Sequence, residues 1–158
     1  AGRRRRAAAA VKLLDVNVLL YAHDTSSAQH ARCRRWLTGV LQGDEHVGLP
    51  WQTLHGFVRI VTNARVVRRP LSGTDACAIV QRWLERPQAV VVEPGERYWT
   101  IFRELVARAQ VQGPLVSDAA LAALAIEQGA TLCTTDRDFR RFDGLTLLDP
   151  TASAIHDD

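Results

Sequence analysis

The run Val-Lys-Leu-Leu-Asp at residues 11–15 is short, mostly apolar, and ends in a carboxylate. Short apolar runs of this kind are typical of buried strands, so Asp15 is expected at the carboxyl end of such a strand. Similar apolar runs occur at residues 90–92, 131–134 and 145–148. The sequence therefore predicts four short strands.

Helical patterns separate these strands. Apolar residues recur at helical spacing in four segments, at residues 25–42, 50–61, 101–109 and 117–128. Ser72 and Asp75 have the spacing of a capping box ahead of a further helix that carries Ile79 and Leu84. Alternating strands and helices predict a three-layer α/β fold, in which helices flank a short parallel sheet. Ligands in such folds bind beyond the carboxyl ends of the strands.

Length and charge indicate one folded domain with a basic tail. A chain of 158 residues suits a single domain. Its net charge of +3 depends on four arginines at residues 3–6, without which 16 basic residues face 17 acidic ones. We expect a basic, flexible tail over residues 1–10, a folded domain over residues 11–150, and a C-terminal tail over residues 151–158.

Cysteine usage and hydropathy favour the cytoplasm. The three cysteines, Cys33, Cys77 and Cys133, are far apart and form no Cys-x-x-Cys pair, which argues against a thiolate metal site. The apolar run at residues 7–11 is shorter than the roughly 7–15 residues of a signal-peptide core. No stretch approaches the roughly 18 apolar residues of a membrane span. We therefore expect a cytoplasmic protein without a membrane segment.

Three aspartates carry the functional signal. Taken singly, Asp15 could form an Asx turn, Asp118 could be a favourable first-turn residue of its helix, and Asp136 could cap a short helix. Taken together, Asp15 and Asp136 both follow apolar strands, and Asp118 opens the helix before the second of them. Asp15 and Asp136 are therefore expected at one edge of the sheet, because strand carboxyl ends share that edge. We infer that Asp118 joins them, because a helix N-terminus normally lies at the same edge.

Carboxylates that converge in this way repel one another unless a cation lies between them. Oxygen ligands favour Mg²⁺ or Mn²⁺, which carboxylates and water hold. Such a metal centre can activate water and stabilise the charge of a phosphoryl transition state.

Three segments resemble the motifs of PIN domains, in the same order and at similar spacing. Residues 13–22 (LLDVNVLLYA) are similar to the opening strand and turn, residues 115–125 (LVSDAALAALA) to the third motif, and residues 131–139 (TLCTTDRDF) to the fourth. The resemblance covers about residues 11–149. The compact length is similar to that of the VapC toxins of type II toxin–antitoxin pairs.

The resemblance implies a magnesium-dependent endoribonuclease, with Mn²⁺ as an alternative metal. The family's metal ligands correspond here to Asp15, Asp118 and Asp136. Asn17 would orient Asp15 by a hydrogen bond, Thr134 would contact the site through its hydroxyl, and Asp138 would be a supporting acid. The resemblance also implies an RNA substrate, a cognate VapB-type antitoxin, and a homodimer or a toxin–antitoxin hetero-oligomer.

One position departs from the family pattern. The family usually has a glutamate on the helix after the first, and aligning residues 53–59 with that helix puts Gly56 at its position. His55 and Gln52 are the nearest polar side chains, and either of them, or water, could take the place of the glutamate. The alternative is a PIN fold with impaired catalysis that binds RNA or a protein partner.

Two other enzyme classes fit the sequence less well. Aspartyl-phosphate hydrolases and receiver domains also place an aspartate after the first strand, but they use a lysine farther along the chain. No lysine follows Lys12 in this sequence. A glycine-rich nucleotide-binding loop of the Walker type is absent as well, so a nucleotide triphosphatase is not supported.

Overall fold

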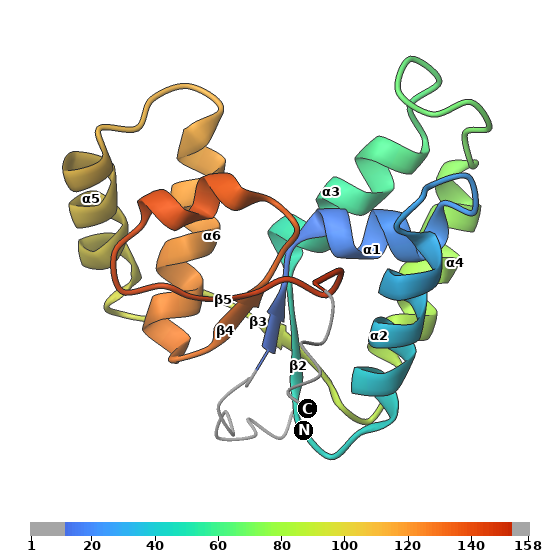
Figure 1. Ribbon diagram of the computed structural model, residues 1–158, viewed down its shortest axis with the longest axis horizontal. Helices are drawn as coiled ribbons and strands as arrows, with labels where there is room; N and C mark the ends of the chain where they lie inside the picture. The colour runs from blue at the N-terminus through green and yellow to red at the C-terminus, as the bar shows by residue number, and fades with distance from the viewer. Residues whose placement is uncertain (1–11, 153–158) are drawn as a thin grey trace, which may run out of the picture.

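Five parallel strands form the centre of the computed structural model, which describes residues 12–152 (Figure 1). The strands are β1 (Lys12–Leu14), β2 (Val47–Pro50), β3 (Ala89–Val92), β4 (Thr131–Cys133) and β5 (Thr146–Leu148). They lie in the order β3-β2-β1-β4-β5, and every neighbouring pair is parallel. The predicted parallel sheet is confirmed.

Helices cover both faces of this sheet and complete three layers (Figure 1). One face carries α1 (Val16–His23), α2 (His30–Gln42), α3 (Trp51–Val61) and α4 (Gly73–Leu84). The other face carries α5 (Tyr98–Ala109), α6 (Leu115–Gln128) and the short 3-10 helix η1 (Arg137–Arg141). Residues 1–11 and 153–158 lie outside the described residues, so the predicted tails and domain limits stay predictions.

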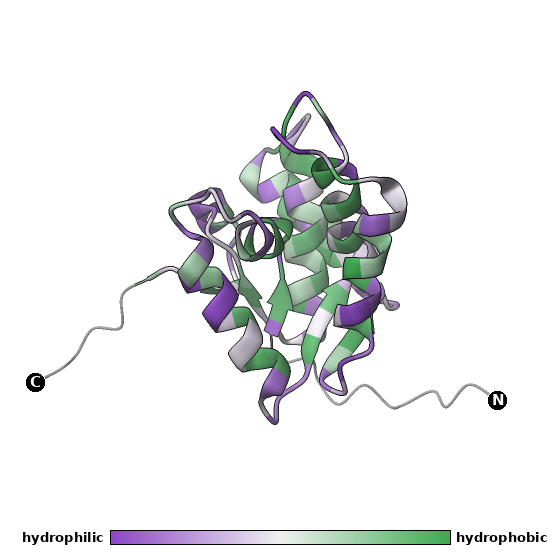
Figure 2. Ribbon diagram, turned by 90° about the vertical axis from the view of Figure 1, so that its right-hand side faces the viewer, coloured by the Kyte–Doolittle hydropathy of each residue, from purple (hydrophilic) through white to green (hydrophobic). Residues whose placement is uncertain are grey.

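Alternation along the strands builds the two halves of the core. Leu13 and Leu132 face the α5–α6 layer, whereas Leu14 and Cys133 face the α1–α4 layer, and all four side chains are fully buried. Because both faces of the sheet are covered, the strands are mostly apolar rather than alternating (Figure 2). This double burial explains why the sequence shows these strands as short continuous apolar runs.

The sequence analysis did not predict β2. Its four residues, Val47–Pro50, include a glycine and a proline, which both weaken a strand pattern. The segment is nevertheless fully buried, and it pairs with β1 on one side and β3 on the other. Tertiary pairing therefore overrides local propensity here, and Pro50 stands at the end of the strand, where it also precedes α3.

The first helix was also not predicted. Residues Val16–His23 are apolar on almost every side, so they show no helical periodicity. The helix α2 begins at His30, later than the predicted start near residue 25. Asp24 accepts hydrogen bonds from both the backbone N–H and the hydroxyl of Ser26, and these local bonds compete with helix formation.

Other boundaries agree closely with the predictions. The side chain of Ser72 accepts a hydrogen bond from the backbone N–H of Asp75 at 3.0 Å and caps α4. Gly129 ends α6 with a φ of 62°, a left-handed conformation that glycine adopts readily. The start of α6 is Leu115, two residues before the predicted Ser117, and Asp118 remains in its first turn.

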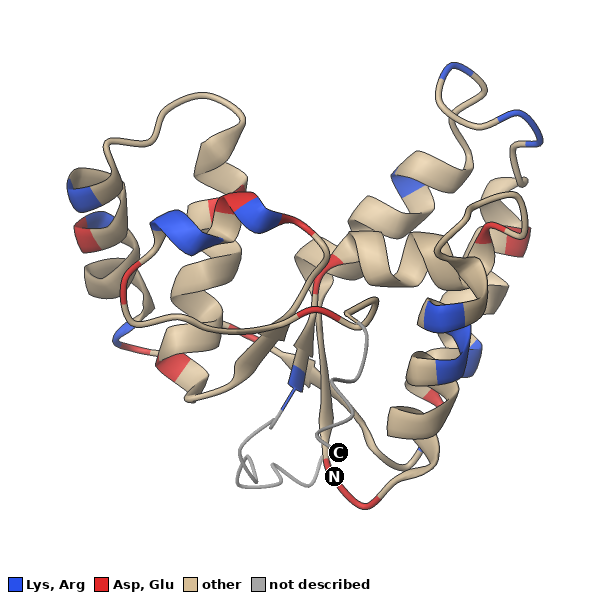
Figure 3. Ribbon diagram, in the orientation of Figure 1, with Lys and Arg blue, Asp and Glu red and all other residues tan. Residues whose placement is uncertain are grey.

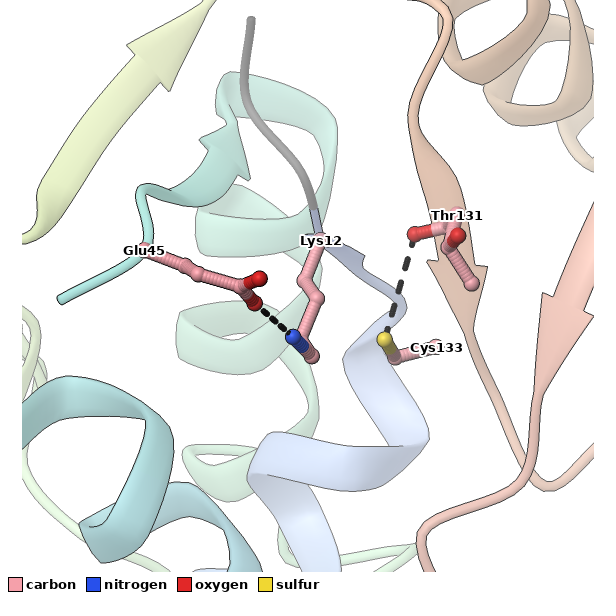
Figure 4. A network of polar contacts seen from close by, with 4 residues as sticks. All are labelled: Lys12, Glu45, Thr131 and Cys133. Atoms are coloured by element: carbon pink, nitrogen blue, oxygen red, sulfur yellow. Dashed lines mark hydrogen bonds and ion pairs between the residues drawn. The ribbon is translucent and has the colours of Figure 1, made fainter. Parts of the chain in front are cut away.

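The only lysine of the chain lies at the end of β1 opposite Asp15. Lys12 forms an ion pair with Glu45 in the segment that precedes β2 (Figure 4). On the next strand, the Cys133 thiol donates a hydrogen bond to the carbonyl oxygen of Thr131 at 3.8 Å. Lys12 is therefore engaged away from the aspartates, which agrees with the rejection of a lysine-dependent phosphohydrolase.

Within residues 12–152, no helix has both the length and the apolar character needed to cross a membrane.

Candidate active site

The aspartates gather where the direction of the sheet topology reverses. From β1 the chain moves outward through β2 to β3, then returns to place β4 on the other side of β1. The helices that follow β1 and β4 therefore pack on opposite faces and leave a crevice above the two strand ends. Asp15 follows β1 directly, and Thr134 follows β4 directly.

Asp15 is held rigidly at the end of β1. It is the N-cap of α1, and its Oδ1 accepts the backbone N–H of Val16 at 2.7 Å. Its Oδ2 accepts bonds from the Asn17 amide at 3.2 Å and from the Thr134 hydroxyl at 2.8 Å. The side chain is only 9% exposed. The Asp15 carboxylate therefore caps α1 and is also held in place as a candidate site residue.

The Thr134 hydroxyl joins three polar groups across β1 and β4. It donates to Asp15 and accepts bonds from the Asn17 amide at 3.1 Å and from the backbone N–H of Asp136 at 3.0 Å. One hydroxyl supplies one donor and two acceptor sites, so its capacity is fully used. The side-chain amide oxygen of Asn17 in turn accepts a hydrogen bond from the backbone N–H of Thr135 at 3.3 Å. Thr134 and Asn17 thus fix the orientation of Asp15 relative to the loop after β4.

Asp136 and Asp138 open the short helix η1. The Oδ1 of Asp136 accepts the backbone N–H of Asp138 at 2.8 Å, as the helix-cap interpretation predicts. Asp138 is exposed and lies 3.9 Å from the guanidinium of Arg141. The cap directs the chain so that the Asp136 carboxylate stays beside the strand ends.

Asp118 approaches the same crevice from the first turn of α6. Burial and the negative charges of Asp136, Asp15 and Asp138 raise the pKa of Asp118 to about 6, while Arg141 opposes the rise. Among residues 12–152, no side chain or backbone group donates a hydrogen bond to this carboxylate. In the folded chain the charges of the sequence-predicted aspartates therefore act on one another. Figure 3 shows acidic segments at the starts of α1 and η1, near the ends of the strands.

The pKa of Asp15 is raised as well. Burial is the main cause, the hydrogen bonds from Thr134 and Val16 partly offset it, and the charge of Asp136 adds to the rise. Uncompensated negative charge in a partly buried crevice attracts a cation.

A cleft of about 590 Å³ opens beside these carboxylates, between α3 and the start of α6. Asp15 and Asp118 line it together with Gln52, His55 and Arg59 of α3. A smaller hollow of about 140 Å³ lies on the other side, lined by Asp136, Thr134, Arg137 and Arg140. Asp15 and Asp118 therefore line the cleft, whereas Asp136 lines the smaller hollow.

Gly56, which aligns with the family glutamate position, lies in the cleft wall. Gln52 donates its amide N–H to the backbone oxygen of Ser117 at 2.9 Å, which ties α3 to the first turn of α6. His55 is exposed and stacks on Trp51, with ring centroids 5.9 Å apart. The Gln52 amide nitrogen is therefore used in linking α3 to α6. His55 lines the cleft while its ring stacks on Trp51.

Three residues near the crevice were not singled out from the sequence. Thr53 is buried and donates its hydroxyl to the carbonyl oxygen of Leu14 at 2.8 Å, which fixes the end of β1. Arg59 lines the cleft, and Arg141 pairs with Asp138. The only sequence signal for these residues is their nearness to the aligned motifs along α3 and η1. The packing of those helices against the sheet decides that the residues lie beside the crevice.

Comparison with known proteins gives the family. The family model described as PIN domain matches residues 12–145. Ribonuclease VapC43 of Mycobacterium tuberculosis is 42% identical over 143 residues, which cover 90% of this chain and 97% of that protein. The chain belongs to the VapC ribonucleases of the PIN-domain family. Ribonuclease VapC37 of the same organism is 41% identical over 142 residues, covering 90% of this chain and 99% of that protein.

Solved structures agree with the VapC fold. VapBC-1 from nontypeable Haemophilus influenzae superposes with a TM-score of 0.67 at 17% identity, covering 89% of this chain and 98% of that chain. FitAB bound to an IR36 DNA fragment gives a TM-score of 0.62 at 19% identity, covering 92% and 99%. The predicted family and its ribonuclease class are confirmed, and PIN-domain VapC nucleases are generally metal-dependent.

Proposed function

We propose that the acidic crevice is the catalytic centre of a magnesium-dependent endoribonuclease, with Asp15, Asp118 and Asp136 as the residues that hold the metal. The observation that carries this proposal is the place of Asp118, whose pKa is raised to about 6 by burial and by the charges of Asp136, Asp15 and Asp138. A fold retains such repulsion at a cost in stability, and a bound divalent cation would remove that cost.

The donor set fits Mg²⁺ chemically. In the described part of the chain, no three His, Cys, Asp or Glu side chains close around one point as a complete metal cage. Mg²⁺ does not need such a cage, because it keeps several of its waters and usually takes only one or two protein carboxylates directly, so at least one of the three aspartates would hold it through a water. Carboxylate oxygens at the edge of an open cleft match this preference, and nearby thiolate or imidazole clusters that would favour zinc are lacking among residues 12–152.

The chain's own residues would orient the reactants. Asn17 and Thr134 hold Asp15 in one rotamer, and the η1 cap holds the loop that carries Asp136. The cleft beside Asp15 and Asp118 would receive the RNA strand, with a phosphodiester next to the carboxylates. When bound, a divalent cation would lower the pKa of the attacking water and stabilise charge on the phosphoryl oxygens. Hydrolysis adds water across one P–O bond and releases two RNA ends.

The decisive experiment is RNA cleavage by the purified protein in Mg²⁺, in Mn²⁺ and in EDTA, with Asp118→Asn and Asp136→Asn beside it. We expect cleavage with either metal, none in EDTA, and a loss of at least about 100-fold in both variants. The matched control is Asp143→Asn, which changes an exposed aspartate outside the cleft and should cleave at the wild-type rate.

The missing glutamate at Gly56 gives the second candidate, an impaired PIN fold that binds RNA or a partner without cutting. Folded protein that binds RNA but never cleaves it with either metal would favour this candidate. Cleavage that depends on both the metal and Asp118 would exclude it.

The proposed partners follow from the family. We infer that a cognate VapB-type antitoxin covers the acidic crevice, and that the chain forms a homodimer or a toxin–antitoxin hetero-oligomer. Among the structural neighbours are VapBC and FitAB complexes. Three free cysteines, two of them buried, agree with a reducing cytoplasm as the place of action. Co-purification with an antitoxin followed by loss of cleavage would test the pairing.

A further inference from the structure

Two exposed side chains of α3 line the cleft, and a third lies one helical turn before them on the same side of the helix. Trp51, His55 and Arg59 are spaced four residues apart, so they lie on successive turns of one side of the helix. All three are exposed, whereas the opposite side, with Leu54 and Phe57, is buried in the core. His55 and Arg59 also line the cleft that contains Asp15 and Asp118. We call Trp51, His55 and Arg59 the α3 stripe.

Two members of the α3 stripe form an ordered aromatic pair. The rings of Trp51 and His55 are stacked, with centroids 5.9 Å apart and planes 24° from parallel. The indole N–H of Trp51 donates to the Glu93 carboxylate at 3.2 Å, which fixes the rotation of the ring. Trp51 nevertheless remains 43% exposed. A flat ring that is held in place and still open to solvent suits stacking of a nucleobase.

The third member supplies positive charge. Arg59 has no ion-pair partner among residues 12–152, although it stands on the rim of a cleft that contains carboxylates. A free guanidinium binds phosphate oxygens through paired hydrogen bonds. Aromatic rings followed by a cation along one groove are the combination that binds single-stranded nucleic acid.

We propose that the α3 stripe binds the unpaired RNA segment that enters the cleft, with one base stacked on the Trp51–His55 pair and a phosphate on Arg59. This inference rests on the proposed function, because it assigns the RNA strand to the same cleft. Bases inside an A-form duplex are stacked on each other and cannot reach an aromatic ring on the protein. The α3 stripe is therefore assigned to the single-stranded part of the bound RNA.

The first test is RNA binding by the purified protein carrying Asp118→Asn, which blocks cleavage during the measurement. Fluorescence anisotropy of a labelled single-stranded RNA in Mg²⁺ gives its Kd, and the corresponding duplex is measured in parallel. Adding Trp51→Ala should raise the Kd for the single strand about 5- to 150-fold and leave the Kd for the duplex unchanged. Trp51→Phe, which keeps an aromatic ring, should bind like the parent.

The matched control for the aromatic change is Trp99→Ala. Trp99 is 64% exposed on α5, in the helical layer on the other side of the sheet from α3, so its removal should leave RNA binding unchanged. His55→Ala gives a second reading of the aromatic pair if Trp51→Ala does not fold, and it should weaken single-strand binding in the same direction.

The second test addresses Arg59 through salt. The slope of log Kd against log salt concentration should decrease in magnitude by about 0.7 in Arg59→Gln and remain unchanged in Arg59→Lys. Arg103→Gln, which removes an exposed arginine on α5, should leave the slope unchanged. A merely structural role for Arg59 would alter stability without moving this slope.

Wild-type single-strand affinity in Trp51→Ala and His55→Ala would overturn the proposal. If those variants instead change the oligomeric state or antitoxin binding, the α3 stripe is a protein-docking surface and the proposal is also wrong. Both results can occur while the wild-type protein still cleaves RNA with Asp118 and Mg²⁺, which would leave the proposed function standing. Absence of cleavage by the wild-type protein would contradict the proposed function, and the binding comparison would still decide the role of the stripe.

Discussion

The hydroxyl of Thr134 occupies the centre of the polar network between β1 and β4. It donates to Asp15 and accepts from both Asn17 and the backbone of Asp136, so one small group orients two of the aspartates. A valine has nearly the same shape but none of these bonds. The consequences of Thr134→Val therefore separate orientation from packing.

We predict that Thr134→Val lowers the cleavage rate about 10- to 100-fold, because the supporting hydrogen bonds of a metal site affect its activity on that scale. It should also lower the free energy of unfolding by about 1–3 kcal/mol, because buried polar groups lose their partner. Cleavage kinetics and denaturant unfolding measure the two effects. Thr53→Val is the control: its hydroxyl bonds only the Leu14 carbonyl, so stability should fall with a much smaller loss of cleavage. Equal loss of cleavage in the two variants would contradict the orienting role.

The carboxyl group of Asp118 makes the metal-free protein sensitive to pH. Its pKa is about 6 in the folded protein, above the usual value of 3.8. The folded state therefore binds more protons than the unfolded state between these values, and this group's contribution to stability falls as pH rises through that window. At pH 8 the carboxylate is charged, so burial and repulsion both oppose folding, and at pH 4 the group is largely neutral.

We predict that Asp118→Asn abolishes cleavage but raises Tm at pH 8 in EDTA. Solvent reaches Asp118 and screens its charge, so the gain is limited to about 1 kcal/mol, or about 2–4 °C. The gain should shrink toward zero at pH 4, where the wild-type carboxyl group is protonated. Thermal unfolding of both proteins at the two pH values measures it. An Asn variant that is less stable than wild type at pH 8 would show that the carboxylate is not under repulsion.

At the scale of elements, α3 forms part of the cleft wall and also carries Gly56, the position that departs from the family pattern. The motif alignment gives the position of Gly56 on this helix, but the tight packing of α3 on α1 decides what could stand there. A Cβ at Gly56 would meet Val16 Cγ2 at 3.4 Å, which is an ordinary van der Waals contact. The helix therefore has room for a Cβ at this position.

We predict that Gly56→Glu lowers the Mg²⁺ concentration for half-maximal cleavage by about tenfold, the scale of one added charge near a partly solvated site. Gly56→Ala should leave that concentration unchanged and stabilise α3 by up to about 1 kcal/mol, because alanine favours a helix more than glycine does. Metal titrations of cleavage and thermal unfolding of both variants provide the comparison. Identical metal titrations for the Glu and Ala variants would show that Gly56 does not face the metal.

The elements also show where local patterns were sufficient. Ser72 with Asp75, and Gly129, predicted their helix ends because capping depends on groups within a few residues. The helix α1 and the strand β2 escaped prediction because their conformations depend on burial between other elements. A segment that is apolar on every side, or interrupted by Gly48 and Pro50, carries no periodicity that distinguishes strand from helix.

At the scale of the whole molecule, the metal would connect three separate parts of the chain. Asp15 belongs to the β1–α1 junction, Asp118 to α6, and Asp136 to the loop before η1. A cation bound by these groups in the folded state has no equivalent site in the unfolded chain. Binding should therefore stabilise the entire fold.

We predict that Mg²⁺ at 100 times its Kd raises the free energy of unfolding by about 2.7 kcal/mol, or Tm by roughly 5–10 °C. The increase should disappear in Asp118→Asn and persist in Asp143→Asn, which retains the whole crevice. Thermal unfolding across a Mg²⁺ titration measures it. A rise of equal size in Asp118→Asn would place the bound metal elsewhere.

The sequence by itself determined the α/β class, the parallel sheet, and the three aspartates at the ends of their elements, because strand and helix signals are local and strand ends share an edge. It also determined the absence of a glutamate at Gly56. The tertiary structure alone decided that Gln52 bonds Ser117, that Arg59 lines the cleft, and that burial and three neighbouring charges raise the pKa of Asp118. These properties depend on the distances between residues far apart in the chain, and only the packing of α3, α6 and η1 around β1 and β4 sets those distances.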